Sequence, residues 1–174
     1  MGDLFQQVND DQDVVKKLFN KIPGFKGYIE RENRRASDKV LRELVSQRYQ
    51  EQWKRVSALQ RDLVKEGELS LVGDLESASL KLTQFSDRIK TAAYGHSSFF
   101  EAIKINEDEL KSLYDYDNAL LTSADTIAHA IDNVEASLGT DGLPAAVRNL
   151  VSQAQESVDL FNRRSEVFLS FGEQ

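Results

Sequence analysis

Histidines and carboxylates at helical spacing are the first candidates for chemistry in this sequence. Asp125, His129 and Asp132 are four and three residues apart, so on a helix they share one face. The other histidine, His96, stands far from them. Di-metal sites in helical bundles need two Glu-x-x-His segments and further inward glutamates, and the sequence has no such segment. We therefore predict no metal residue and no cofactor.

Nucleophilic catalysis also lacks its usual signals. The sequence contains no cysteine, which excludes thiol chemistry and disulfides. It has no glycine-rich phosphate loop and no nucleophile elbow, the sharp turn that exposes a catalytic serine. We predict a protein without enzymatic activity and assign no catalytic residue.

Charged residues stack along one face of residues 28–42. Glu30, Arg34, Asp38 and Arg42 follow one another at steps of four, and Arg35 lies beside them. One interpretation is a solvated ladder of ion pairs, which stabilises a helix only slightly. The other is a pair of guanidinium groups presented to a carboxylate or a phosphate. The residues alone leave both interpretations open.

Asp117 stands at a position where the surrounding pattern calls for an apolar side chain. A carboxylate inside a helical bundle must be paired, neutral or reached by water. We expect it to contact an arginine or a tyrosine, and candidate partners are Arg34, Arg35, Tyr114 and Tyr116. Rotation toward solvent and a ligand or metal site are the alternatives. The candidate polar site is thus Arg34, Arg35, Asp38, Tyr114 and Asp117.

Aromatic residues gather at a predicted helix junction. Residues 94–100, YGHSSFF, run from Tyr94 to Phe100 and hold a glycine that ends the preceding helix. Such aromatics usually plug the end of a bundle. The alternative is a pocket for a small molecule.

Long segments with a 3.5-residue apolar repeat carry these residues, and this repeat is typical of coiled coils. The predicted helices are residues 28–66, 69–93, 106–138 and 144–171, with Gly139 ending the third. The predicted buried positions are Leu41, Val45, Arg48, Gln52, Val56, Leu59 and Leu63; Leu71, Leu75, Ala78, Leu82, Phe85, Ile89 and Ala92; Leu110, Leu113, Asp117, Leu120, Ala124, Ile127, Ile131, Val134 and Leu138; and Val147, Val151, Ala154, Val158, Phe161, Ser165 and Phe168.

Short connections make successive helices antiparallel. We predict an all-α protein, an antiparallel up-and-down four-helix bundle with long coiled-coil-like helices and a short N-terminal helix. Residues 1–27 form the amphipathic N-terminal helix, at about residues 11–22, and a turn, and residues 28–174 form the bundle domain. Because Arg48 and Gln52 interrupt the first apolar row, that helix is incompletely buried or packs its middle against a polar surface.

Composition narrows the partners. The formal net charge of -7 disfavours nucleic acid, which requires a cationic surface. Residues 1–67 hold 14 Lys/Arg against 11 Asp/Glu, whereas residues 68–174 hold 8 against 18, so the halves could attract each other within a bundle or between subunits. The N-terminal residues lack the features of a signal peptide, and no apolar stretch is long enough to span a bilayer. We expect a cytoplasmic protein.

Three segments together resemble a known pattern. They are IPGFKGYIERENRRASDKVLR at residues 22–42, YGHSSFF at residues 94–100 and LYDYDNALL at residues 113–121. The chain resembles an uncharacterised group of bacterial helical-bundle proteins with IPG-x-x-GY, RR-x-x-D, YG-x-x-x-FF and LY-x-x-D elements. The resemblance implies no activity. It implies that Arg34, Arg35, Asp38 and Asp117 belong to one recurring polar arrangement.

Regular apolar rows without a catalytic constellation favour a non-enzymatic helical interaction or scaffold protein, with a protein partner or a second copy of itself. One alternative is a small-molecule or metal-binding bundle centred on Asp117 and residues 94–100. The other is a peripheral membrane protein that attaches through residues 11–22, whose apolar face and lysines suit a lipid surface.

Overall fold

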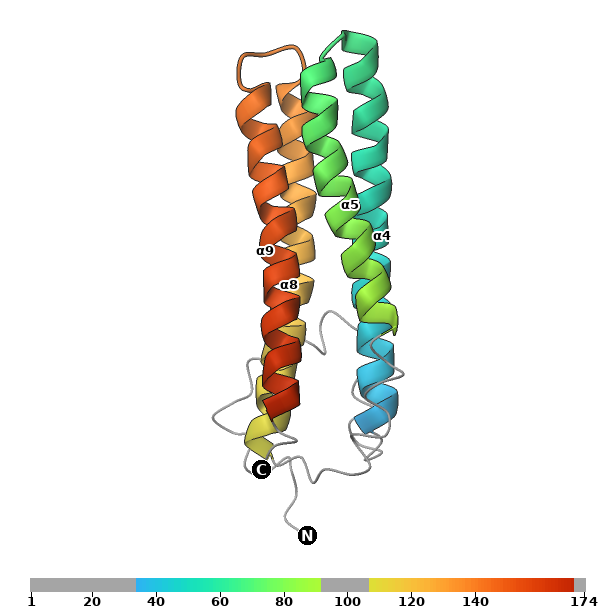
Figure 1. Cartoon of the computed structure of the whole chain (residues 1–174), viewed down its shortest axis with the longest axis vertical. Helices are drawn as coiled ribbons and strands as arrows, with labels where there is room; N and C mark the ends of the chain where they lie inside the picture. Colours follow the sequence, from blue (N-terminus) through green and yellow to red (C-terminus); the bar gives the residue numbers. More distant parts are fainter. Residues whose placement is uncertain (1–33, 92–106, 171–174) are drawn as a thin grey trace.

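The computed structural model describes residues 34–91 and 107–170, and they form four long α-helices (Figure 1). These are α4 (Arg34–Glu66), α5 (Leu69–Thr91), α8 (Glu107–Ser137) and α9 (Leu143–Ser170). The prediction of an all-α, up-and-down four-helix bundle is confirmed. The predicted N-terminal helix at residues 11–22 and the aromatic junction at residues 94–100 lie outside the described residues.

Glycines end the two helices that lead into short turns, and one of them, Gly139, stands at the predicted position. Gly67 has φ 82° and Gly139 has φ 71°, in the left-handed region that suits a residue without a Cβ atom. After α4, the amide of Glu68 donates to the carbonyl of Leu63 at 3.0 Å, which closes a Schellman motif. Each turn therefore reverses the chain within a few residues. The two turns create two helical hairpins, α4–α5 and α8–α9.

The two hairpins pack so that helices of the same direction become neighbours. Besides its hairpin partner, α4 packs against α8, and α5 packs against α9 (Figure 1). Helices α5 and α8 follow one another in the sequence, but they lie on opposite corners of the bundle. The order around the bundle is therefore α4, α5, α9, α8.

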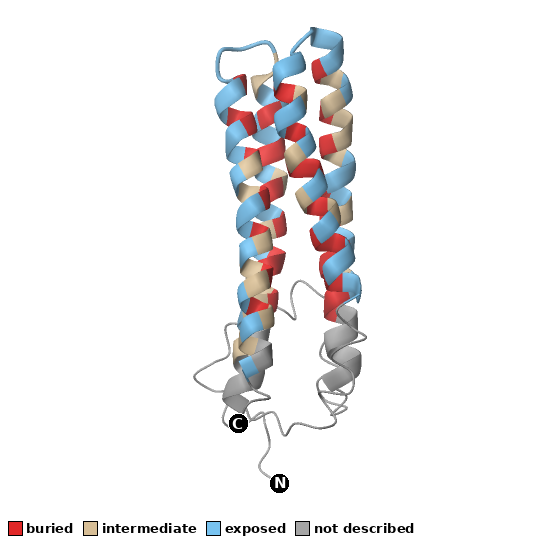
Figure 2. Cartoon of the chain, in the orientation of Figure 1, coloured by how far each residue is buried: buried red, intermediate tan, exposed pale blue. Residues whose placement is uncertain are grey.

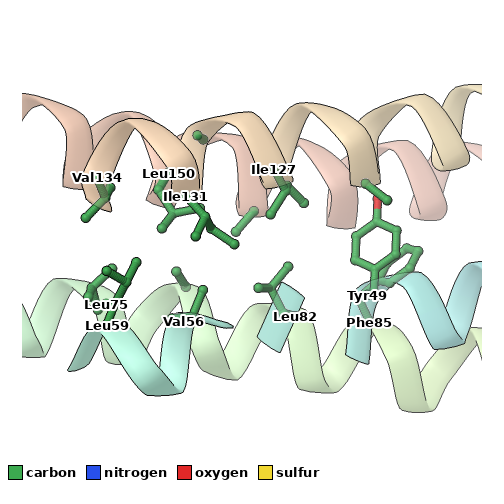
Figure 3. Close-up of a cluster of buried hydrophobic side chains, with 14 of the residues drawn as sticks. Tyr49, Val56, Leu59, Leu75, Leu82, Phe85, Ile127, Ile131, Val134 and Leu150 are labelled. Carbon is green, nitrogen blue, oxygen red and sulfur yellow. The ribbon is translucent and has the colours of Figure 1, made fainter. Parts of the chain in front are cut away.

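Buried residues form a continuous row on the inward side of every helix, whereas exposed residues cover the outside (Figure 2). The predicted rows of α5 and α8 are confirmed wherever their side chains are described, except that Leu138 is only half-buried. Side chains from all four helices meet in one apolar cluster (Figure 3). Across the described residues, no helix is long and apolar enough to cross a membrane.

The predicted row of α4 is wrong in its middle. Arg48 is exposed, and Tyr49 occupies the core with no exposed surface. The buried row therefore runs through Val45, Tyr49 and Gln52, and two successive steps of four precede the regular alternation. Such a departure from the alternation is called a stutter, and it locally unwinds a coiled coil. The middle of α4 is thus buried, which contradicts the first of the two alternatives, an incompletely buried helix.

The predicted row of α9 is shifted by one residue over much of its length. Val151, Val158 and Ser165 are only half-buried. The fully buried row is Leu143, Val147, Leu150, Ala154, Ser157, Phe161 and Arg164, which alternates steps of four and three throughout. The prediction preferred Val158 to Ser157 and Ser165 to Arg164, but Ser157 and Arg164 find partners on α8 and are buried.

Candidate functional site

The buried carboxylate of Asp117 pairs with Arg164. Nε of Arg164 donates to Oδ1 of Asp117 at 2.6 Å, and Nη2 donates to Oδ2 at 3.3 Å. Each residue exposes only 2% of its surface. A fork-shaped guanidinium that engages both carboxylate oxygens is the strongest form of this contact. The predicted contact between Asp117 and an arginine is confirmed, although the arginine comes from α9.

Sequence reasoning did not identify Arg164 as a site residue. Counting heptads from Leu143 places Arg164 on the buried row, at the level where α9 faces Asp117 of α8. A buried acid in one helix requires a base in its neighbour. Arg164 is the position of α9 where this requirement and the heptad count agree, so the two rules applied together identify the pair.

For the other predicted members of the polar site, the structure describes the helix position but not the contacts of every side chain. Arg34, Arg35 and Asp38 lie in the first turns of α4, and Tyr114 lies in α8, but the surroundings of their side chains fall outside the described residues. Tyr116 is half-buried. The arrangement of Arg34, Arg35 and Asp38 with Asp117 therefore stays a prediction.

A second polar group lies farther along the core, around Tyr49. The phenol hydroxyl donates to the backbone carbonyl of Leu120 at 3.2 Å, and the hydroxyls of Ser123 and Ser157 lie within hydrogen-bonding reach of it. The two serines are themselves 2.8 Å apart and join α8 to α9. Burial raises the pKa of Tyr49, although the nearby hydroxyls of Ser123 and Ser157 partly oppose this shift.

Aromatic rings pack beside the ring of Tyr49. The Tyr49 and Phe85 ring centroids are 4.0 Å apart, and Phe161 meets Phe85 edge-on at 5.4 Å. Figure 3 shows the Tyr49 ring beside Phe85, with its hydroxyl directed across the core. Arg88 covers the outer side of Phe161 at 5.1 Å from its centroid. Because Tyr49 has no exposed surface, water does not compete for the bond that its phenol makes.

A serine pair joins α4 to α5 near the same level. The hydroxyls of Ser46 and Ser86 are 3.0 Å apart, and each lies 3.3 Å from the carbonyl of the other residue. The ion pair, the phenol group and this serine pair make three polar contacts, each between different helices. Because their geometry depends on the alignment of the helices, we interpret them as contacts that fix register.

The surface carries a different feature on the α4–α5 hairpin. Among the described residues, the large apolar side chains that remain exposed are Trp53, Val64, Leu69 and Leu80, with exposed fractions of 37%, 52%, 67% and 52%. All four belong to this hairpin. We call them the hairpin face. A cluster of exposed apolar side chains is a common mark of a binding surface.

The hydrogen bonds between α4 and α5 place this face along their outer junction. Ser46 and Gln60 stand seven residues before and after Trp53, and both bond to α5. Glu76, which accepts from Gln60 at 2.8 Å, lies on the same stripe of α5 as Leu69 and Leu80. Trp53 and Val64 are eleven residues apart, which is three helical turns, and so are Leu69 and Leu80.

The register of the α4–α5 hairpin pairs the four side chains across the two helices, and we call each pair a rung. It sets Trp53 opposite Leu80, and it sets Val64 opposite Leu69 beside the turn at Gly67. The two rungs are about 16 Å apart at the rise of an α-helix. They frame a strip two helices wide on the outside of the bundle.

Charged side chains accompany this strip. On α4, the exposed Lys54, Arg61 and Lys65 are seven and four residues apart and share one stripe, and Lys65 pairs with Asp62 at 2.8 Å. On α5, the exposed Glu76 accepts from Gln60 and therefore lies at the junction of the two helices. The hairpin face is thus apolar in two rungs, with cationic side chains on α4 and a carboxylate between the helices.

The remaining candidates of the sequence analysis lie on the surface of α8. Asp132 and Glu135 accept from Nη2 of Arg55, at 2.5 and 3.1 Å, so they connect α8 to α4. The bond from Arg55 keeps the pKa of Asp132 below its usual range. The side chain of His129 is 84% exposed, and its Nδ1 atom lies 3.7 Å from Oδ2 of Asp132. Within the described parts of the chain, no cluster of three or more His, Asp or Glu side chains could hold a metal ion.

Comparison with known proteins adds no relative to this description. No protein-family model, curated protein or solved structure matches the chain, so its function is inferred from the geometry of the bundle alone.

Proposed function

We propose that this chain is a non-enzymatic helical interaction protein that binds another protein through the hairpin face. The observation that carries the proposal is the concentration of exposed Trp53, Val64, Leu69 and Leu80 on one hairpin. Tryptophan is enriched among the residues that dominate binding energy in protein interfaces. A cytoplasmic location stays a prediction from the sequence.

The polar contacts of the core support a structural role beneath this surface. Arg164 occupies both oxygens of Asp117, and the Tyr49 hydroxyl bonds to the backbone of α8. These groups hold the four helices in one alignment. A rigid bundle presents a surface patch without the entropic cost of ordering it on binding. This arrangement favours an interaction module over the alternative of a small-molecule or metal site at Asp117.

The test compares proteins captured from cells of the source organism by the wild-type chain and by two variants. Leu80→Glu places a charge in the hairpin face, and Ala136→Glu places the same charge on the exposed side of α8. We expect a defined protein to be captured by the wild type and by Ala136→Glu but lost with Leu80→Glu, because a desolvated charge opposes docking. Circular dichroism must show that both variants remain folded. Identical captured sets for all three proteins would contradict the proposal.

A further inference from the structure

We draw no further inference here: the strongest candidate, the exposed apolar face of the α4–α5 hairpin formed by Trp53, Val64, Leu69 and Leu80, carries nothing beyond the proposed function because nothing in the structure shows what covers it.

Discussion

The carboxylate of Asp117 has lost almost all contact with water, and Arg164 compensates for that loss. Removing a charge from water costs several kcal/mol, and a buried ion pair recovers this cost only when its geometry is good. Here both carboxylate oxygens accept from the same guanidinium group. The pair is therefore costly to break from one side, although it contributes little to net stability compared with apolar residues of similar size.

Removing one member of the pair tests this account. We expect Asp117→Ala to lower the free energy of unfolding by about 3 to 5 kcal/mol, because Arg164 keeps its charge in the core and loses both bonds to the carboxylate. Replacing both residues, Asp117→Leu with Arg164→Met, should cost much less than the sum of the single changes. Urea unfolding followed by circular dichroism measures both effects, and Asp115→Ala, at an exposed position of α8, is the control. Additive losses would show that the two side chains do not depend on each other.

At the residue scale, the sequence predicted that Asp117 needed a basic or aromatic partner, but it did not identify that partner. The row assigned to α9 contained Ser165 in place of Arg164 because hydrophobicity was used to choose between adjacent positions. Hydrophobicity fails where a polar residue is buried by its bond to another polar residue. The hairpin face was also missed, because the exposure of Trp53 depends on which side of α4 contacts α5.

At the scale of the element, α4 combines a shift in its buried heptad row with the buried side-chain amide of Gln52. The row passes through Tyr49 and Gln52, and the Oε1 atom of Gln52 is buried without a hydrogen-bond partner. A buried acceptor of this kind loses its bond to water and gains nothing in return. Gln52 is thus a weak point in the middle of the longest described helix.

Replacing this amide should stabilise the protein. We expect Gln52→Leu to raise the free energy of unfolding by about 1 kcal/mol, because an apolar side chain of similar size needs no hydrogen bond. Chemical unfolding at neutral pH measures the change, and Gln84→Leu on the exposed side of α5 controls for the general effect of leucine on helix stability. A loss of stability would indicate that the amide has a partner or a role that its geometry does not show.

The helices themselves were predictable because a 3.5-residue repeat and a terminal glycine act locally. Gly139 ended its helix where expected, since a positive φ suits glycine wherever it occurs. The phase of the buried row was less predictable, since it depends on neighbouring helices. Nor does any local signal state that α4 lies beside α8 while α5 lies beside α9.

At the scale of the whole molecule, Tyr49 connects all four helices. It belongs to α4, stacks on Phe85 of α5, donates to Leu120 of α8 and lies within hydrogen-bonding reach of Ser157 of α9. Burial raises its pKa above the ordinary value of about 10, because the charged phenolate cannot be solvated in the core. Ionisation of this one side chain is therefore coupled to unfolding of the entire bundle.

Alkaline unfolding tests this coupling. Because the folded pKa is raised, the contribution of Tyr49 to stability is complete below its ordinary pKa and is lost as the pH rises through the higher folded value. We expect the free energy of unfolding to fall more steeply above pH of about 10 in the wild type than in Tyr49→Phe, which has no ionisable group at this site. Absorbance of tyrosinate near 295 nm should show one late-titrating tyrosine that the variant lacks. Identical pH profiles would show that Tyr49 titrates independently of folding.

The placement of both hairpin turns at one end of the bundle has a mechanical consequence. The start of α4 and the end of α9 emerge together at the opposite end, so a force applied between them does not slide helices past one another (Figure 1). This force instead separates the helices one layer at a time. The separation begins beside Asp117 and Arg164 and reaches the turns last. A tether attached to these two ends would thus meet low resistance that rises in steps at the polar contacts. The same bundle pulled from the α8–α9 turn to the start of α4 would load its helices in shear.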